Sequence, residues 1–324
     1  MTSFYRFLDP LSRVIAPMSD GLLRRVLLAS GVEERAATLG GVSISYYYRP
    51  GSPAADRSAV RQRLSIAKRI LLRQRPAKRP TPILLIHGLG DNALTWSAVI
   101  ELLAAGREVF AIDLPGYGLS GLPRDQHYMA TAQICEVLEL FLREVIGQPA
   151  LVVGNSLGGW LAVRVAQRSP DLIGEVMLVN AGGAYLEGLA SWEPFRQVVA
   201  VADLKTTRQA IRQMLGFVPA ALVYLGQRGI QERFQRQVVR AFVEYADEHD
   251  FLKPEDLHGL AVPVSLAWGL GDQFLPHGSF EFFRQNLPNA PLLAIRNCGH
   301  LPQRERPTLL VRFVDTRAEL LDHP

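Results

Sequence analysis

The sequence predicts an α/β protein in which a mostly parallel sheet, doubly wound by helices, carries an inserted helical cap. Short apolar runs alternate with helix-length segments from residue 82 onward and again after residue 260. Between about residues 183 and 259 this alternation stops, and the apolar residues fall only at helical spacing. The length of 324 residues, 48% of them hydrophobic, suits one large α/β domain with an insertion, or two domains.

The first 34 residues are expected to form an N-terminal helical arm. Apolar residues recur at three- or four-residue steps from Phe4 to Leu22, in a stripe that two prolines interrupt. Such a stripe more often packs on the domain than touches lipid or covers a substrate entrance. The next two runs lie on either side of Gly40-Gly41, and the second, Val42 to Tyr48, alternates at period two. They predict a hairpin of edge strands.

The α/β core is expected in two parts, residues 35–182 and 260–324, with the cap over residues 183–259 between them. Because helices separate its strands, these are expected to run parallel with helices on both faces. Strands are predicted at residues 83–86, 107–112, 151–153, 175–179, 263–268 and 291–295. Helices are predicted at residues 96–105, 130–146, directly after 156, and 307–321.

A basic insertion over residues 50–80 stands apart from the rest of the chain. Nine basic and no acidic residues lie from Arg57 to Arg79. Because the formal net charge of the chain is +4, the charges of all its other residues sum to −5. Apolar residues within it share one helical stripe, which permits docking on an anionic membrane or simply packing on the domain. Nucleic acid is not expected, because no aromatic residue interleaves the basic ones to stack on bases.

The composition also limits where the protein acts. No run of eighteen apolar residues is present, and no secretory leader is recognisable, so neither a membrane-spanning helix nor export is expected. Cys135 and Cys298 are too few for a disulfide framework, which indicates a reducing compartment. We therefore expect a cytoplasmic protein, peripheral to the membrane if the insertion binds lipid.

The chemistry is expected at the segment Ala150-Leu-Val-Val-Gly-Asn-Ser-Leu-Gly-Gly159. Its apolar run ends at a glycine, and a helix begins directly after Ser156. A serine in so tight a strand-to-helix turn is held in a strained backbone conformation, with its hydroxyl exposed. Gly154 and Gly158 are expected where side chains would collide with the packed strand and helix. The pattern predicts that Ser156 is a nucleophile facing the positive end of a helix.

Two later strand ends carry an acid and a histidine, Asp272 and His300. Because the carboxyl ends of parallel strands share one edge of the sheet, both can converge on Ser156. His300 would accept the serine proton and return it to the leaving group, while Asp272 would fix the tautomer and stabilise the imidazolium. Each residue alone could equally be a surface histidine or a turn cap, but their order after the serine favours catalysis.

An oxyanion loop is expected in His87-Gly-Leu-Gly-Asp91, which follows the first strand of the core. The backbone N–H groups of Leu89 and Leu157 would stabilise the negative charge of a tetrahedral intermediate. His87 is expected to shape this loop through hydrogen bonds rather than to take part in the reaction. Neither a metal motif nor a phosphate loop is present, and no cofactor or metal is expected.

Together these motifs resemble the α/β-hydrolase superfamily, in its branch of capped serine esterases and lipases. The resemblance runs from about Val42 to the C-terminus, and its fold is implied for that part of the chain. Haloalkane dehalogenases and epoxide hydrolases of this superfamily would carry aspartate in the strand-to-helix turn (the elbow), where this chain has Ser156. Carbon–carbon bond hydrolases share the Gly-Asn-Ser-x-Gly-Gly elbow but typically have tryptophan after the histidine, where this chain has Leu301. The segments that match are His87-Gly-Leu-Gly90, Asp113-Leu-Pro-Gly-Tyr-Gly-Leu-Ser120, Gly154–Gly159, Trp268–Asp272 and Cys298-Gly-His300.

We therefore predict a serine hydrolase that cleaves small carboxylic esters with a hydrophobic acyl group through an acyl-enzyme. The apolar cap, with Phe195 and Phe242 expected to contact substrate, favours an apolar acyl or alkyl group. A carbon–carbon bond hydrolase of meta-cleavage-product type is the first alternative. A non-catalytic binding protein on a hydrolase fold is the second.

The basic insertion generates a prediction of its own. Near an anionic bilayer each Lys or Arg can contribute about 1 kcal/mol, so the chain should sediment with phosphatidylglycerol vesicles but not with phosphatidylcholine vesicles. Replacing Arg61, Arg63, Lys68 and Arg69 by glutamine should abolish sedimentation and leave hydrolysis of a soluble ester intact. Vesicle binding that changes neither with salt concentration nor with these substitutions would contradict electrostatic docking through the insertion.

Overall fold

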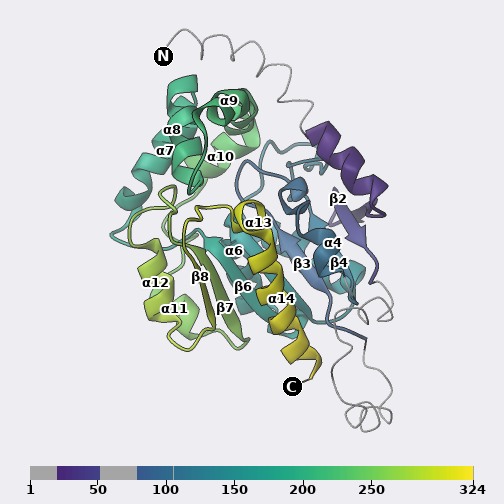
Figure 1. The fold of residues 1–324 in the computed structure, drawn as a ribbon. Coiled ribbons are helices and arrows are strands. Elements are labelled where there is room, and N and C mark those ends of the chain that lie inside the picture. Colours follow the sequence, from purple (N-terminus) through teal and green to yellow (C-terminus); the bar gives the residue numbers. More distant parts are fainter. Residues whose placement is uncertain (1–19, 52–78, 105, 324) are drawn as a thin grey trace.

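The computed structural model describes residues 20–51, 79–104 and 106–323 (Figure 1). Most of the expected N-terminal arm and the basic insertion, residues 57–78 included, lie outside the described residues. Of the arm, a helix over residues 20–29 is described, and it packs its Leu27 into the core. None of the helices in the described part of the chain combines the length and apolarity needed to cross a bilayer.

The described residues form one eight-stranded sheet in the order β1-β2-β4-β3-β5-β6-β7-β8. β1 and β2 form the predicted antiparallel hairpin, but β2 also pairs antiparallel with β4, so of these two strands only β1 lies at an edge of the sheet. The other neighbours are parallel, as predicted. The strands are β1 (Glu33–Leu39), β2 (Val42–Arg49), β3 (Ile83–Ile86), β4 (Val109–Ile112), β5 (Ala150–Ser156), β6 (Ile173–Ala181), β7 (Val264–Gly269) and β8 (Leu292–Ile295).

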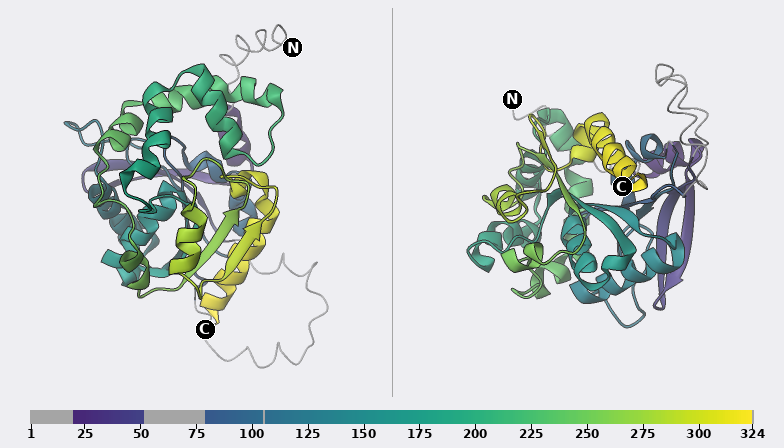
Figure 2. Two further views of the ribbon diagram at one scale, coloured as in Figure 1. Left: turned by 90° about the vertical axis from the view of Figure 1, so that its left-hand side faces the viewer. Right: turned by 90° about the horizontal axis from the view of Figure 1, so that it is seen from below.

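The central strands are apolar along their length because both faces of the sheet are covered (Figure 2). Successive residues point to opposite faces, so β3 gives Leu84 and Ile86 to one core and Ile83 and Leu85 to the other. The first core also contains residues of the helices α5 (Thr131–Leu140) and α6 (Leu157–Arg168). The second contains residues of α4 (Ile100–Leu103), α14 (Pro307–Asp322) and the helix over residues 20–29.

The helices follow the predicted alternation with one clear correction. The expected helix over residues 96–105 is instead a 3₁₀ turn, η2, and the single-turn helix α4. The Asn92 side chain accepts a hydrogen bond from the Leu94 N–H and starts η2 early, and Val99 then breaks the helical backbone at φ −122°. The core helices are η2 (Ala93–Trp96), α4 (Ile100–Leu103), α5 (Thr131–Leu140), η3 (Phe141–Ile146), α6 (Leu157–Arg168), η4 (Pro170–Leu172), α11 (Pro254–His258), α12 (Ser279–Asn286), α13 (Pro302–Glu305) and α14 (Pro307–Asp322).

A separate group of helices stands at the carboxyl ends of the parallel strands (Figure 1). These helices are η5 (Leu189–Trp192), α7 (Glu193–Val201), α8 (Leu204–Met214), α9 (Ala220–Gln235) and α10 (Gln237–Tyr245). The expected cap range also includes α11, but this helix contacts α6 and α12 beside the sheet. The cap above the strand ends therefore consists of η5 and α7 to α10.

Candidate active site

Ser156 occupies the turn between β5 and α6 in the strained conformation that the sequence predicts, with φ 54° and ψ −117°. A Cβ atom on Gly154 would lie 2.3 Å from the carbonyl of Gly158, and one on Gly158 would lie 2.3 Å from the carbonyl oxygen of Ile86. Both contacts are with backbone, which has little room to move. The two glycines therefore allow β3, β5 and α6 to approach closely enough to hold the serine in this turn.

Asp272 and His300 come together from loops that follow β7 and β8. The Nδ1 atom of His300 lies 2.8 Å from Oδ2 of Asp272, and both side chains are about 4% exposed. Burial raises the pKa of Asp272, but the nearby His300 and several hydrogen bonds outweigh it and lower this pKa overall. An ionised carboxylate only accepts hydrogen bonds, so Nδ1 carries the proton and Nε2 is left as a base.

Two asparagines that the sequence reasoning missed fix this arrangement. Asn180 is the last residue but one of β6 and has φ 41°. Its amide donates to Oδ2 of Asp272 at 2.7 Å. Asn155 donates to the carbonyl oxygens of Val179 and His300, each at 3.0 Å, and so joins the residue before the serine to the histidine loop. An asparagine beside the elbow serine was a visible signal for Asn155, whereas nothing in the local sequence of Asn180 marks its role.

The expected oxyanion loop passes next to the serine. A Cβ atom on Gly88 would lie 3.0 Å from Cβ of Ser156 and 3.6 Å from its Oγ. The carbonyl of Gly88 accepts a hydrogen bond from the Asp91 N–H, and Gly90 has φ +72°, which makes a tight turn with Leu89 at its second position. Leu157 opens α6, where the first N–H groups have no partner within the helix.

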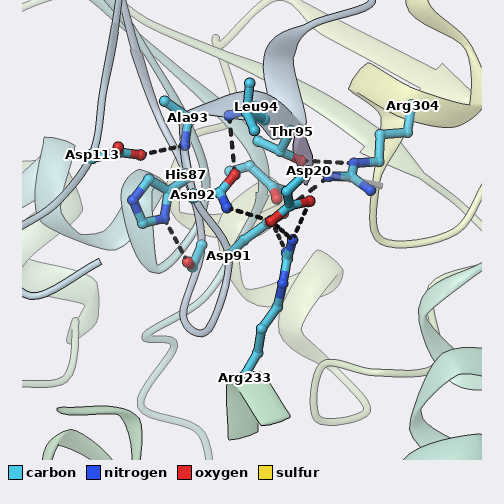
Figure 3. A network of polar contacts seen from close by, with 12 residues as sticks. Asp20, His87, Asp91, Asn92, Ala93, Leu94, Thr95, Asp113, Arg233 and Arg304 are labelled. Carbon is cyan, nitrogen blue, oxygen red and sulfur yellow. Dashed lines mark hydrogen bonds and ion pairs between the residues drawn. The ribbon is translucent and has the colours of Figure 1, made fainter. Parts of the chain in front are cut away.

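His87 holds the base of this loop through hydrogen bonds, as the sequence predicts (Figure 3). Its Nε2 accepts a hydrogen bond from the Leu114 N–H at 3.0 Å, so its Nδ1 carries the proton and donates to the carbonyl of Gly88 at 2.8 Å. Burial lowers the pKa of His87 and keeps the ring neutral. The neighbouring Asp113 accepts from the N–H groups of Ala93 and Leu119 and orders the loops after β3 and β4.

A pocket of about 520 Å³, part of it open to solvent, lies between Ser156 and the cap. The indole N–H groups of Trp160 and Trp192 donate to backbone carbonyls of Asp250 and Ala184, so both rings present carbon to the pocket. Its lining residues are Leu89, Ser156, Leu157, Trp160, Gly182, Trp192, Phe195, Arg196, Phe242, Val243, Ala246, Phe251 and Leu275.

Most of the residues predicted for the site meet at this pocket. Ser156, Leu89, Leu157 and both predicted cap residues, Phe195 and Phe242, line it. Asp272 and His300 do not line it; their link to the serine turn is the hydrogen bond from Asn155 to the carbonyl of His300, and Phe274 in the loop after Asp272 packs on the His300 ring with centroids 5.1 Å apart. Within the described ranges, no three His, Cys, Asp or Glu side chains are grouped to hold a metal ion. The pocket thus brings Ser156, the expected nucleophile, together with Leu89 and Leu157, whose N–H groups are the expected backbone donors.

Comparison with known proteins gives a family. The model of the alpha/beta hydrolase family matches residues 83–313. An esterase of Mycobacterium tuberculosis is 29% identical over 255 residues, which cover 72% of this chain and 83% of that protein. Lipase 3 of a Moraxella species is 24% identical over 230 residues, which cover 69% of this chain and 73% of that protein.

Solved structures share the fold. A membrane phospholipase A, described as a bacterial virulence factor, has a TM-score of 0.71 at 20% identity and covers 100% of both chains. A hydrolase of 2-hydroxy-6-oxo-6-phenylhexa-2,4-dienoate from a Rhodococcus species has a TM-score of 0.66 at 18% identity, covering 89% of this chain and 99% of its own. At such identities the likeness establishes architecture and leaves the substrate open.

Proposed function

Because the chain belongs to the alpha/beta hydrolase family, we propose that it is a serine hydrolase that cleaves carboxylic esters with a hydrophobic acyl group. One observation carries the proposal: Ser156, in its strained turn, lines an apolar pocket together with Leu89 and Leu157. The named esterase and lipase among its relatives support the same reaction class.

The proposed reaction has two steps and runs through an acyl-enzyme. Nε2 of His300 accepts the proton of Ser156 as its Oγ attacks the ester carbonyl, and Asp272 stabilises the imidazolium that forms. The N–H groups of Leu89 and Leu157 bind the oxyanion. His300 then protonates the leaving alcohol, the acyl group stays on Ser156, and a water activated by the same histidine releases it.

The largely apolar lining of the pocket and the residue after His300 favour an ester over the carbon–carbon alternative. A dienoate substrate is an anion and needs a cationic partner when it is buried. Among the described residues Arg196 is the one charged side chain that lines the pocket, and its Nη2 is already used to donate to the carbonyls of Val243 and Glu244 at the end of α10. Leu301 also stands where the carbon–carbon bond hydrolases typically have tryptophan. An apolar acyl chain requires no such partner.

The proposal predicts measurable hydrolysis of p-nitrophenyl esters and little turnover of a vinylogous diketone acid. Ser156→Ala should lower kcat by roughly six orders of magnitude, because the nucleophile is lost. Asp272→Asn should cost less, roughly 10⁴-fold, because it spoils the tautomer of His300 but spares the serine. A folded Ser156→Ala variant that keeps more than a few per cent of activity would exclude this mechanism. Faster turnover of the diketone than of any ester would favour the carbon–carbon alternative.

The cap generates a second prediction, on acyl preference. Phe195→Ala or Phe242→Ala should change the ratio of short-chain to long-chain kcat/KM, because each ring lines the pocket and binds the acyl group without taking part in the chemistry. Phe217→Ala is the matched control, since this cap phenylalanine is 83% exposed and does not line the pocket. Equal losses at every chain length would show that Phe195 and Phe242 only support the fold.

A further inference from the structure

A cluster of charged side chains joins the cap to the oxyanion loop and lies outside the reaction described above (Figure 3). It brings together Asp20 from the helix over residues 20–29, Asp91 from the loop after β3, Arg233 from α9 and Arg304 from α13. These residues are far apart in the sequence, so the cluster exists only when the cap and the N-terminal helix are docked on the core.

Arg233 is the centre of the cluster. Its Nη1 donates to Oδ1 of Asp91, and its Nη2 donates to both carboxylate oxygens of Asp20 at 2.9 and 2.7 Å. Asn92, next to Asp91, donates to Oδ2 of Asp20 at 3.0 Å and closes the ring of contacts. The guanidinium fork therefore holds a segment of the oxyanion loop and the N-terminal helix at once.

The ion pair between Arg233 and Asp91 is largely withdrawn from solvent, with side-chain exposures of 20% and 15%, whereas Asp20 and Arg304 at its border are 36% and 37% exposed. Burial opposes ionisation of Asp91, but Arg304 and Arg233 outweigh it and lower the pKa of Asp91 to about 2. A charge in such a place is costly to leave without its partner. The loop is therefore stabilised in the position in which Asp91 meets both Arg233 and Arg304.

Asp91 also closes the turn that carries Leu89. Its N–H donates to the carbonyl of Gly88, and the turn passes through Gly90 at φ +72°. Phe234, the next residue of α9, packs on this turn, because a Cβ atom on Gly90 would lie 3.5 Å from its ring. Arg233 thus holds Asp91 by an ion pair, and the next residue, Phe234, holds Gly90 by van der Waals contact.

We propose that Arg233 is a positioning residue, which couples docking of the cap to the alignment of the Leu89 N–H in the oxyanion hole. This rests on the proposed function, since an oxyanion forms only if Ser156 attacks a carbonyl. A backbone donor stabilises the oxyanion when it lies about 2.7–3.1 Å from the place where the charge develops. A small displacement of the turn therefore weakens stabilisation of the transition state more than binding of the substrate.

The test compares the full-length chain with Arg233→Met, Arg233→Lys and Asp20→Asn on p-nitrophenyl esters of several acyl lengths. Because losing a whole oxyanion donor costs about 10²–10³-fold in kcat, Arg233→Met should lower kcat by about 10–100-fold with KM changed less than about threefold. The loss should be the same at every acyl length. Arg233→Lys and Asp20→Asn, which keep part of the ring, should lose less, and they remain informative if Arg233→Met does not fold.

A second measurement does not depend on turnover. Hydrogen–deuterium exchange of a peptide covering residues 87–95 should accelerate in Arg233→Met, because the turn is released. Arg212→Met is the matched control: this exposed arginine of α8 donates to the carbonyl of Arg208 at 3.3 Å, and its replacement should change neither kcat nor exchange.

The outcomes separate this inference from the function on which it rests. An unchanged kcat in Arg233→Met, an effect on KM alone, or losses that vary with acyl length would overturn the positioning role. Unchanged exchange of residues 87–95 would overturn it as well. If the unaltered chain hydrolyses no ester, the proposed function falls and this inference with it, whatever the exchange data show.

Discussion

Close backbone contact between β3, β5 and α6 is the constraint on which the rest of the site depends. Ser156 can hold φ 54° because Gly154 and Gly158 let the strand and the helix meet at distances that exclude any side chain. The same contact places the N-terminus of α6 beside the carboxyl end of β3, next to the loop that contains Leu89. One packing requirement thus positions the serine and both expected backbone donors.

Polar contacts then fix the loops around this rigid centre. Asn155 ties the serine turn to the backbone of His300, and Asn180 orients the carboxylate that binds the histidine ring. On the other side, Arg233 connects the cap with the oxyanion loop. Buried polar networks of this kind specify one arrangement strongly when every member is satisfied. The cap, in this account, forms the apolar pocket and also contributes to the alignment of the groups at its base.

The sequence carries information about features that repeat locally or sit at a fixed spacing. Apolar runs predict the positions of the parallel strands, and the glycines around Ser156 predict its strained turn. Asn180 and Arg233 could not be found in this way, since their partners lie 92 and 142 residues away in the chain. The prediction of one helix over residues 96–105 was wrong, because apolar periodicity does not reveal that the Asn92 side chain starts a 3₁₀ turn at Ala93. The pairing of β2 with β4 likewise depends on the fold of the whole sheet.

The central claim is that Ser156 is a nucleophile activated by His300, and covalent labelling tests it most directly. An alkyl fluorophosphonate should add once to the folded chain, and peptide mapping by mass spectrometry should place the adduct on Ser156. The adduct should be absent in Ser156→Ala and should form far more slowly in His300→Gln, which keeps the serine but lacks the base. Labelling of another residue, or equal labelling of the unaltered chain and His300→Gln, would contradict the account.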